Sequence, residues 1–462
     1  MSGRSLRRVP LLSGPLDAPV AWRDGVPVDR GRFLALARRL AARLPAEGAA
    51  LHLATDRLAF AVGFAAALLR GQASLLPPNH TPHTVERLRG AFAGTYALVE
   101  PGGDAHGLPS VAIDLEVEPG VDATLSEGVP TIDAETVAAQ VFTSGSTGEP
   151  VPNAKRWGLL VDNARAAAAR LAALAGVRSL EGLSLVATVP PQHMYGFESS
   201  VLIALVGGAA FDASRPFYAA DVAAALDRQP RPRLLVTTPL HLKACVDAGI
   251  PMPPCDLVVS ATAPLAPQLA ARAEAAFGCR LAEIYGCTEA GQVATRRTQD
   301  GPEWTTFDGV VLEGDGDRVT ASGGHVPRPV VLGDVLEVVD ATTFRLLGRS
   351  NDLVNVAGKR SSLSHLSFHL NAVEGVRDGA FWLPPDDDAG GTTRLVAFVV
   401  APNVPAGAIR QGLRERLDPA FLPRRIVHVE ALPRAATGKL PTLALDAFAR
   451  TELARPGNGA RG

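Results

Sequence analysis

The sequence predicts an α/β fold, with a large N-terminal α/β domain of layered sheets and a small mobile α+β C-terminal domain. Three successive sequence patterns along the chain support this prediction. From about residue 28 to 285, short apolar runs alternate with longer amphipathic stretches, a pattern typical of a mostly parallel sheet covered by helices. After residue 290, short runs broken by Gly, Asp and Pro indicate an antiparallel extension. From Gly348 onward, strand-like and helix-like segments mix, which indicates a smaller α+β unit.

The individual elements follow from hydrophobic periodicity. The predicted strands of the first region are short apolar runs, at 49–54, 96–100, 138–143, 183–189, 233–238, 256–261 and 279–285. The predicted helices between them are longer and amphipathic, at 56–70, 163–174, 239–249 and 267–278. In the last region, LVNVA, RLVAFVVAP and RRIVHVE are strand-like, whereas SHLSFHLNAV and about 441–451 are helix-like.

The chain length and the changes in hydrophobic pattern along it together predict two domains. At 462 residues the chain is too long for one ordinary hydrophobic core. We place the large domain at 1–347 and the small one at 348–462, with an active site between them. The tail ARPGNGARG is expected to be disordered.

Composition narrows the class of partner and the compartment. A formal charge of −2 gives no electrostatic reason to expect a nucleic acid or an anionic membrane. No apolar run is long enough for a signal peptide or an integral membrane segment, so we expect a cytoplasmic protein. Its four cysteines have neither metal-ligand spacing nor the density of a disulfide framework, and small buried thiols are expected.

Lysine is almost absent from the chain. Of 45 basic residues only four are lysine, namely Lys155, Lys243, Lys359 and Lys439, and the other 41 are arginine. A coding bias explains the depletion, but each remaining lysine is then a candidate for a site where a compact ammonium is required.

The first motif is a hydroxyl- and glycine-rich loop that follows a predicted strand, in the run VFTSGSTGEP at 141–150. Backbone NH groups next to glycine, together with several hydroxyls, can surround the oxygens of a polyphosphate. A helix-like segment is expected to follow the loop. It is not a Walker loop, which needs GxxxxGK[ST]. A flexible Ser/Gly turn is the alternative interpretation.

The second motif is IYGCTE at 284–289, at the end of a predicted sheet strand where open α/β sheets bind ligands. Tyr285 offers a flat face for a purine, Thr288 a hydroxyl for a phosphate and Glu289 a hard oxygen for Mg²⁺. The alternative is a buried tyrosine followed by a helix cap.

Two further motifs lie near the predicted domain boundary and near the C-terminus. Asp334 precedes the run GRSNDLVNVAGKR at 348–360, and a carboxylate there can accept hydrogen bonds from both ribose hydroxyls. A polar interdomain linker is the alternative. The last motif, LPRAATGK, ends at Lys439, a lysine on a glycine-containing loop in a chain with few lysines.

In this order and spacing the four motifs resemble the signature of the adenylate-forming (ANL) superfamily of AMP-dependent synthetases and ligases, over roughly residues 140 to 440. The resemblance implies an ATP-dependent acid–thiol ligase that forms an acyl-adenylate, releases pyrophosphate and passes the acyl group to a thiol. It implies ATP and Mg²⁺ as cofactors. Residues implied to hold the ATP phosphates form the loop of Thr143, Ser144, Gly145, Ser146, Thr147 and Gly148.

The resemblance also implies a role for each remaining motif residue. Tyr285 lies along the adenine, Thr288 and Glu289 face the α-phosphate and magnesium, and Asp334 with Arg349 holds the ribose. Asn351 falls at the family's hinge, where Asp or Lys is usual. Lys439 matches the catalytic lysine. Its chemistry also follows from electrostatics, because a carboxylate that attacks a phosphate brings two anions together.

The acid pocket is implied by two weaker matches. The run PPQHMYGFE at 190–198 resembles the segment that lines the acyl pocket, and SATAPL at 260–265 resembles the family's Gly-Gly-Ala-Pro-Leu wall. The candidate substrate-binding residues are His193, Tyr195, Phe197, Glu198 and Thr262. A satisfied core histidine is the alternative for His193.

Two departures from the family pattern stand out. The lysine expected directly after Pro150 is absent, and Lys155 is the nearest candidate to reach back in its place. After Arg360 the run SSLSH replaces an acidic helix start. No phosphopantetheine attachment site follows the last motif, so any carrier must be a separate protein.

The short chain, PQHMYGFE and YGCTEAGQVATRRT are similar to free-standing aryl-acid AMP ligases of aryl-polyene and xanthomonadin-type pigment pathways. This resemblance implies a small carboxylic acid such as 4-hydroxybenzoate as the substrate and an acyl carrier protein, rather than coenzyme A, as the acceptor. A fatty or short-chain acyl-CoA synthetase is the runner-up. A non-catalytic nucleotide-binding regulatory protein is the alternative from another class.

Overall fold

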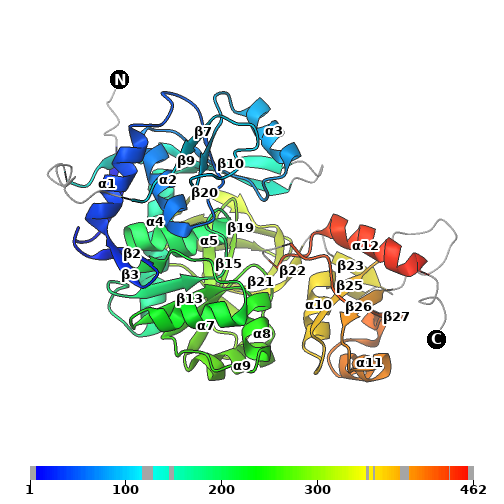
Figure 1. The fold of residues 1–462 in the computed structure, drawn as a ribbon. Coiled ribbons are helices and arrows are strands. Elements are labelled where there is room, and N and C mark those ends of the chain that lie inside the picture. Colours follow the sequence, from blue (N-terminus) through cyan, green and yellow to red (C-terminus); the bar gives the residue numbers. More distant parts are fainter. Residues whose placement is uncertain are drawn as a thin grey trace.

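The computed structural model describes residues 7–116, 128–144, 150–349, 353–356, 359–384, 395–435 and 438–455. It confirms the predicted α/β class, with layered sheets in a large lobe and a small α+β lobe at the C-terminus (Figure 1). Within these ranges no helix is both long and apolar enough to cross a membrane.

The first sheet of the large lobe is mostly parallel. Among the described residues it has six strands, in the order β10-β9-β5-β4-β6-β7, and only β10 runs antiparallel to its neighbour. The strands are β4 (Ala50–His52), β5 (Ser74–Leu76), β6 (Tyr96–Val99), β7 (Ser110–Ala112), β9 (Val137–Ser144) and β10 (Pro150–Arg156). The helices in this part of the chain are α1 (Arg30–Ala41), α2 (Arg57–Leu69) and α3 (Pro82–Ala91), and β1 (Arg8–Pro10) pairs with β8 (Thr131–Asp133).

The second sheet carries most of the predicted site. Its described part has eleven strands, in the order β21-β22-β17-β16-β15-β14-β13-β11-β12-β2-β3. The neighbouring strands β15, β14, β13, β11, β12 and β2 are parallel, and β3 is antiparallel to β2. The predicted antiparallel extension is formed by β16, β17, β22 and β21. The strands are β2 (Pro19–Arg23), β3 (Val26–Asp29), β11 (Ser184–Ala187), β12 (Ala210–Asp212), β13 (Arg233–Thr237), β14 (Leu257–Ser260), β15 (Arg280–Cys287), β16 (Gly291–Arg296), β17 (Glu303–Thr306), β21 (Asp334–Asp340) and β22 (Thr343–Arg349).

Helices pack on this sheet for reasons visible in the sequence. The alanine-rich α4 buries Leu160, Ala164 and Leu171 in the main core, and α9 begins with Pro267 and ends at Gly278, which has a φ of 64°. The helices are α4 (Trp157–Ala175), α5 (Met194–Gly196), the π-helix η2 (Phe197–Leu202), α6 (Ile203–Gly207), α7 (Ala219–Arg228), α8 (Pro239–Asp247) and α9 (Pro267–Phe277). The run RVTAS, predicted with the extension, instead belongs to a separate sheet of β18 (Val311–Asp315), β19 (Arg318–Gly323) and β20 (Val326–Val331).

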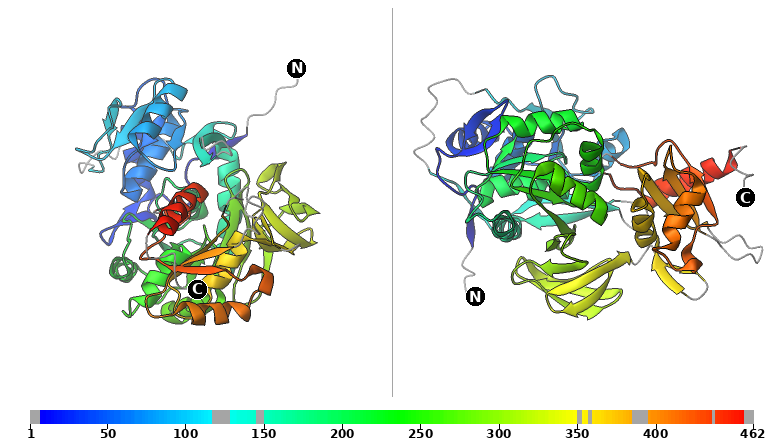
Figure 2. Two further views of the ribbon diagram at one scale, coloured as in Figure 1. Left: turned by 90° about the vertical axis from the view of Figure 1, so that its right-hand side faces the viewer. Right: turned by 90° about the horizontal axis from the view of Figure 1, so that it is seen from below.

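The small lobe has its own core. In Figure 1 it lies to the right of the large lobe, on the side of α8, and the right-hand view of Figure 2 again shows the two lobes side by side. Its elements are β23 (Leu353–Val356), β24 (Lys359–Ser362), α10 (Leu363–Asn371), β25 (Asp378–Trp382), β26 (Val396–Val400), α11 (Ala406–Arg414), a 3₁₀ turn (Pro419–Phe421), β27 (Arg425–His428) and α12 (Thr442–Ala454).

The buried hydrophobic residues divide between the lobes. The main cluster of the large lobe extends as far as Leu346, and the first cluster of the small lobe begins at Val354. None of the clusters formed by the described residues mixes the two sides. The predicted boundary at 347/348 falls inside β22, and we propose that the lobes separate just after that strand.

Candidate functional site

The residues predicted to bind adenine and ribose lie where β15 meets the antiparallel extension. The hydroxyl of Tyr285 on β15 donates a hydrogen bond of 2.7 Å to Oδ2 of Asp334 at the start of β21. The Tyr285 ring lies edge-on to Trp304 and Phe344, with centroids 5.8 Å and 5.4 Å away. These two rings fix the tyrosine, and its hydroxyl in turn orients the Asp334 carboxylate.

Arg349 is brought to the same place by strand pairing. In the β21–β22 ladder the residue opposite Asp334 is Arg349. Residues opposite each other on antiparallel strands are close neighbours, about 5 Å apart. The three residues predicted for adenine and ribose, from three strands, are therefore assembled together.

The hydroxyl-rich loop joins β9 to β10. Thr143 and Ser144 form the end of β9, and Ser144 is paired with Pro150 at the start of β10. Gly145, Ser146, Thr147 and Gly148 lie outside the described residues. The helix expected after the loop is α4, which begins at Trp157, but the strand β10 lies between the loop and this helix.

The prolines of this segment explain why its strand was overlooked. Pro150 and Pro152 lower the β propensity of the run, yet both lie in β10. This strand is at the edge of its sheet, where a missing backbone donor is tolerated.

Thr288 and Glu289 form the turn between β15 and β16. Glu289 is exposed and Thr288 half-buried. Lys155 on β10 donates hydrogen bonds to the backbone carbonyls of both residues, with 3.4 Å to the oxygen of Glu289. The sequence left the role of Lys155 open, and the structure places its ammonium on this turn.

An Mg²⁺ ion fits this turn when the substrate phosphates are also present. Among the described residues there is no cluster of three or more His, Cys, Asp or Glu side chains that could hold a metal ion alone. Mg²⁺ is commonly held by one or two carboxylates together with phosphates and waters. The exposed carboxylate of Glu289 fits that mode.

The loop that carries Lys439 lies against the large lobe. Gly438 has a φ of 79°, and a Cβ there would be 3.3 Å from Cβ of Leu240 and 3.8 Å from Oγ1 of Thr238, the N-cap of α8. Lys439 itself is exposed, and its carbonyl accepts a hydrogen bond of 2.8 Å from the NH of Ala435. The glycine thus permits a close approach that brings the lysine to the interface.

Lys439 acts electrostatically on His193 of the large lobe. Burial, together with the positive charge of Lys439, lowers the pKa of His193 to about 4. His193 is therefore neutral at pH 7, and its Nδ1 has no hydrogen-bond partner within the described structure. Two predicted site residues about 250 positions apart in the chain thus lie near each other.

The other predicted pocket residues after β11 divide into two groups. Phe197 has no exposed surface and packs edge-on against Phe60 and Phe64, with centroids 6.0 Å and 4.9 Å away. Tyr195 is 7% exposed, and its hydroxyl donates a 3.0 Å hydrogen bond to the carbonyl of Val259. In this structure both side chains are used by the core, rather than pointing into an open pocket.

Glu198 is a buried acid whose carboxylate lies close to Gly291, just after the Thr288–Glu289 turn. Its side chain is 3% exposed, and Asn163 on α4 donates a hydrogen bond to Oε1. Burial raises the pKa of Glu198 to about 7, although Lys155 and Asn163 oppose this rise. Asn163 was not predicted, although a polar residue on the buried face of an alanine-rich helix was a usable signal.

Thr262 occupies an unusual backbone position after β14. Its φ is 79°, in the left-handed region that glycine prefers. A β-branched residue is strained there, and such strain is concentrated at functional sites. Thr262 occupies a position where the family motif has glycine. The segment 260–265 must therefore be held in this conformation by the residues packed around it.

Arg57 is a second residue that the sequence did not single out. It is fully buried at the start of α2 and donates to the carbonyls of Ala187 and Val189 at 2.9 Å and to Oγ of Ser200 at 2.6 Å. Burial lowers its pKa to about 10. Arg57 ties the end of β11 to η2, and so fixes both ends of the segment that carries His193.

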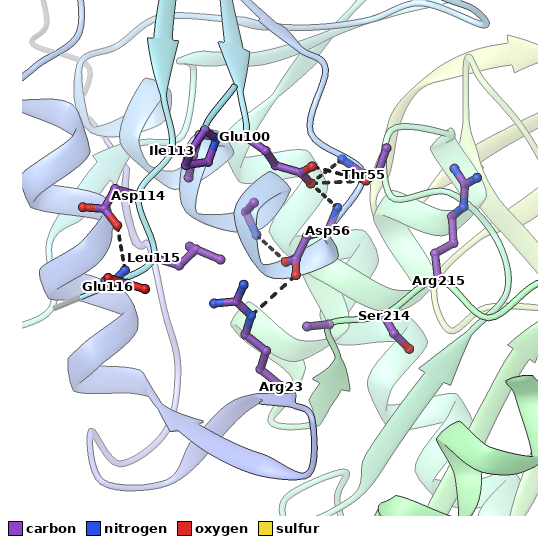
Figure 3. Close-up of a pocket in the computed structure, with 13 residues that line it drawn as sticks. Arg23, Thr55, Asp56, Glu100, Ile113, Asp114, Leu115, Glu116, Ser214 and Arg215 are labelled. Carbon is purple, nitrogen blue, oxygen red and sulfur yellow. Dashed lines mark hydrogen bonds and ion pairs between the residues drawn. The ribbon is translucent and has the colours of Figure 1, made fainter. Parts of the chain in front are cut away.

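A cavity of about 880 Å³ lies elsewhere, between the two large sheets (Figure 3). None of the predicted site residues lines it. Arg23 lies 3.8 Å from Asp56, and Glu100 accepts hydrogen bonds of 2.9 Å and 2.8 Å from the NH groups of Thr55 and Asp56. These charged groups are engaged with the protein itself, so we assign no ligand to this cavity.

Comparison with known proteins identifies the family. Residues 37–351 match the family described as AMP-binding enzyme. The chain belongs to this family. The 4-coumarate–CoA ligase of Rhodobacter capsulatus is 31% identical over 310 residues, which cover 66% of this chain and 75% of that protein. The 2,3-dihydroxybenzoate–AMP ligase of Bacillus subtilis is 25% identical over 218 residues, or 38% and 40% of the two chains.

A solved structure extends the likeness in fold to the small lobe. It is the o-succinylbenzoate coenzyme A synthetase of Bacillus subtilis in complex with ATP and a magnesium ion, with a TM-score of 0.75. The match covers 93% of this chain and 97% of that one at 17% identity, which shows the fold alone.

This AMP-binding enzyme is an AMP-forming acid–thiol ligase of the acyl-adenylate-forming superfamily. The sequence prediction of the superfamily is thereby confirmed. The alternative of a non-catalytic nucleotide-binding protein is set aside.

Proposed function

We propose that this AMP-binding enzyme activates an aryl acid of the 4-hydroxybenzoate type and transfers the aryl group to the phosphopantetheine thiol of a separate acyl carrier protein. The observation that supports activation of the acid is the approach of the Lys439 loop to α8. Lys439 is close enough to His193 to lower the pKa of that histidine. A cation from the small lobe is thus placed beside the segment that resembles the acyl pocket.

The first half-reaction joins the acid to AMP. A carboxylate oxygen of the acid forms a bond to the α-phosphorus of ATP, and the bond from that phosphorus to the bridging oxygen breaks, which releases pyrophosphate. Lys439 offsets the repulsion between the two anions as they approach. When bound, Mg²⁺ supplies positive charge to the phosphate oxygens.

The protein's own residues position the nucleotide for this step. We assign the adenine to the Tyr285 ring and the ribose hydroxyls to Asp334 and Arg349. The triphosphate is assigned to the β9–β10 loop, with Thr288 and Glu289 at the α-phosphate and the metal. These assignments rest on the assembly of Tyr285, Asp334 and Arg349 at one point of the sheet.

In the second half-reaction a thiol replaces AMP. The sulfur, after losing its proton, forms a bond to the acyl carbon, and the bond from that carbon to the AMP oxygen breaks. We assign the change between the two halves to rotation of the small lobe about Asn351, which lies outside the described residues. Such a lid that serves two chemistries is a known device.

The acid class is supported by the pocket candidates and by the relatives. His193 has an unpartnered ring nitrogen, and Glu198, five positions further along the chain, forms a buried polar pair with Asn163. Two matched relatives are named for 4-coumarate and 2,3-dihydroxybenzoate, which are both hydroxylated aromatic acids. A site of this kind suits a ring with a hydroxyl better than a long alkyl chain.

The carrier protein is favoured as acceptor by the subfamily resemblance, and a cytoplasmic location fits the four free cysteines of the described chain. Coenzyme A is the competing acceptor, because the relative of Rhodobacter capsulatus is named as a CoA ligase.

The test is a matrix of acids against the two thiols. Pyrophosphate release is measured with benzoate, 4-hydroxybenzoate, 4-coumarate and a medium-chain fatty acid, and thioester formation with coenzyme A and with a phosphopantetheinylated carrier. We expect 4-hydroxybenzoate and the carrier to be fastest. A pocket that pairs the hydroxyl should disfavour benzoate by roughly tenfold or more, since an unpaired buried polar group costs about 1–3 kcal/mol. A preference for the fatty acid with coenzyme A would contradict the proposal.

A further inference from the structure

Lys155 stands where the family pattern does not expect it. The pattern has a lysine directly after Pro150, but Val151 fills that position. Lys155 lies on the same face of β10 as Val151, four residues further along, because side chains alternate between faces. At a strand rise of about 3.3 Å per residue, the two positions are roughly 13 Å apart. Lys155 therefore does not simply replace the missing lysine.

The contacts of Lys155 indicate a different role. Its ammonium donates to the carbonyls of Thr288 and Glu289 in the turn between β15 and β16. The side chain is half-buried, and burial lowers the pKa of Lys155 while Glu198, Cys287 and Glu289 raise it. A half-buried cation that donates hydrogen bonds to two main-chain carbonyls restrains the backbone of the turn.

Asn163 and Glu198 pack closely against Gly291, at the end of the same turn. Gly291 has a φ of 78°, and a Cβ there would be 2.9 Å from Nδ2 of Asn163 and 3.0 Å from Oε1 of Glu198. The hydrogen bond from Asn163 to Glu198 fixes the carboxylate beneath this glycine. Lys155 thus contacts residues 288 and 289 of this short segment, and the Asn163–Glu198 pair contacts its end at Gly291.

We propose that Lys155 is a positioning residue for adenylation, which holds the Thr288–Glu289 turn so that the Glu289 carboxylate is presented to the phosphates and the metal, with Glu198 and Asn163 as the support beneath Gly291. The expected effect of Lys155 on adenylation rests on the proposed function. The expected effect of Lys155 on the order of the turn does not depend on that function.

The kinetic test compares Lys155→Met, which keeps the length but removes the donors, with Lys155→Arg, which keeps donors. Lys243→Met is the matched control, because Lys243 pairs with Asp247 on the surface of α8. Acid-dependent pyrophosphate exchange is measured against Mg²⁺, ATP and acid. For Lys155→Met we expect kcat to fall about 10- to 100-fold, as for a small misplacement of a reacting group.

The kinetic parameters that change distinguish a positioning role of Lys155 from a general loss of folding. Lys155→Met should need more Mg²⁺ for half-maximal activity, with the KM for the acid unchanged within about twofold and the Tm close to that of wild type. Lys155→Arg should recover part of kcat, and Lys243→Met should behave as wild type. A Lys155→Met enzyme with wild-type kcat and Mg²⁺ response, or with a loss only in the KM for the acid, would overturn the proposal.

A second measurement does not depend on activity. Amide hydrogen exchange of peptides that span residues 287–292 should be faster in Lys155→Met and in Gly291→Ala than in wild type, and unchanged in Lys243→Met. Wild-type exchange in both turn variants would overturn the proposal. If wild type releases no pyrophosphate with any acid, the proposed function has failed, whereas hydrogen exchange still decides the role of Lys155.

A double-mutant cycle tests whether the two supports act together. Glu198→Gln should lower kcat on its own, and the double variant with Lys155→Met should lose less than the product of the two single losses. Strictly multiplicative losses would overturn the shared role of the two residues.

Discussion

The hydroxyl of Tyr285 is hydrogen-bonded to the carboxylate of Asp334 at 2.7 Å, which joins the residue assigned to adenine with the residue assigned to ribose. One side chain comes from the parallel part of the sheet and the other from its antiparallel extension. The pair therefore spans the junction between the two kinds of pairing, and a nucleotide bound there would contact both.

This pair leads to a test that separates the ring of Tyr285 from its hydroxyl. Tyr285→Phe keeps the aromatic face but releases Asp334, so we expect the KM for ATP to rise about tenfold, equivalent to about 1.4 kcal/mol. Tyr96→Phe is the control, because it removes a similar hydrogen bond, to Gln72, in the other sheet. An unchanged KM for ATP in Tyr285→Phe would contradict the assignment of Asp334 to the ribose.

Removal of the Lys439 ammonium should act on the chemical step. Lys439→Ala is expected to lower adenylate formation by at least about a hundredfold, with ATP binding nearly intact, the pattern of a contact made in the transition state. Pyrophosphate exchange and calorimetric ATP binding measure the two effects. Lys243→Ala provides the control for loss of a lysine elsewhere.

The same variant has a spectroscopic consequence. Because Lys439 contributes to the low pKa of His193, Lys439→Ala should raise that pKa from about 4 while burial keeps it below 6.5. The shift is measurable by NMR of labelled histidine. A His193 pKa that does not respond would mean that the lysine is not held beside it in solution.

Glu198 should make stability depend on pH. Its pKa in the folded protein is about 7, above the ordinary value of 4.5, so the native state binds the proton more tightly than the unfolded chain. This contribution is fully present below pH 4.5 and is lost as the pH rises through 7. Denaturant unfolding of wild type and Glu198→Gln at pH 5 and pH 8 should show wild type losing roughly 3 kcal/mol more over this interval. Parallel pH dependences would show that Glu198 does not titrate in this range.

Phe197 should behave as a core residue. With no exposed surface and two aromatic neighbours, its replacement by alanine is expected to reduce the free energy of unfolding by about 3–5 kcal/mol. Tyr218→Ala, at a side chain that is 71% exposed, should change it by less than about 0.5 kcal/mol. If the Phe197→Ala enzyme is as stable as wild type and its acid preference is altered, Phe197 lines the acid pocket.

The hinge assignment stays a prediction. Proline at Asn351 fixes φ and should restrict rotation of the small lobe, so Asn351→Pro is expected to preserve adenylation and slow thioester formation. The two half-reactions are measured separately by pyrophosphate exchange and thioester yield. Equal losses in both would place the hinge elsewhere.

Several strands and helices of the large lobe were predictable, because short apolar runs and longer amphipathic stretches mark them in the sequence. The run at 279–285 became β15, and the Ala-rich stretch at 163–174 lies inside α4. β10 was not predictable, since two prolines oppose a strand and only the edge position in the sheet permits them. Phe197 and Tyr195 were assigned to the pocket because the family motif contains them, but the direction of a side chain depends on packing between distant elements.

The sequence by itself determined the family, the α/β class and the identity of the motif residues, because these depend on local periodicity and on residue types at fixed spacing. Only the tertiary structure decided which of them meet. Lys155 and Thr288 are separated by 133 positions, and Tyr285 and Asp334 by 49, yet each pair forms a hydrogen bond. Such contacts arise when the order of strands in the sheet brings distant parts of the chain together. That order cannot be read from the sequence around either residue alone.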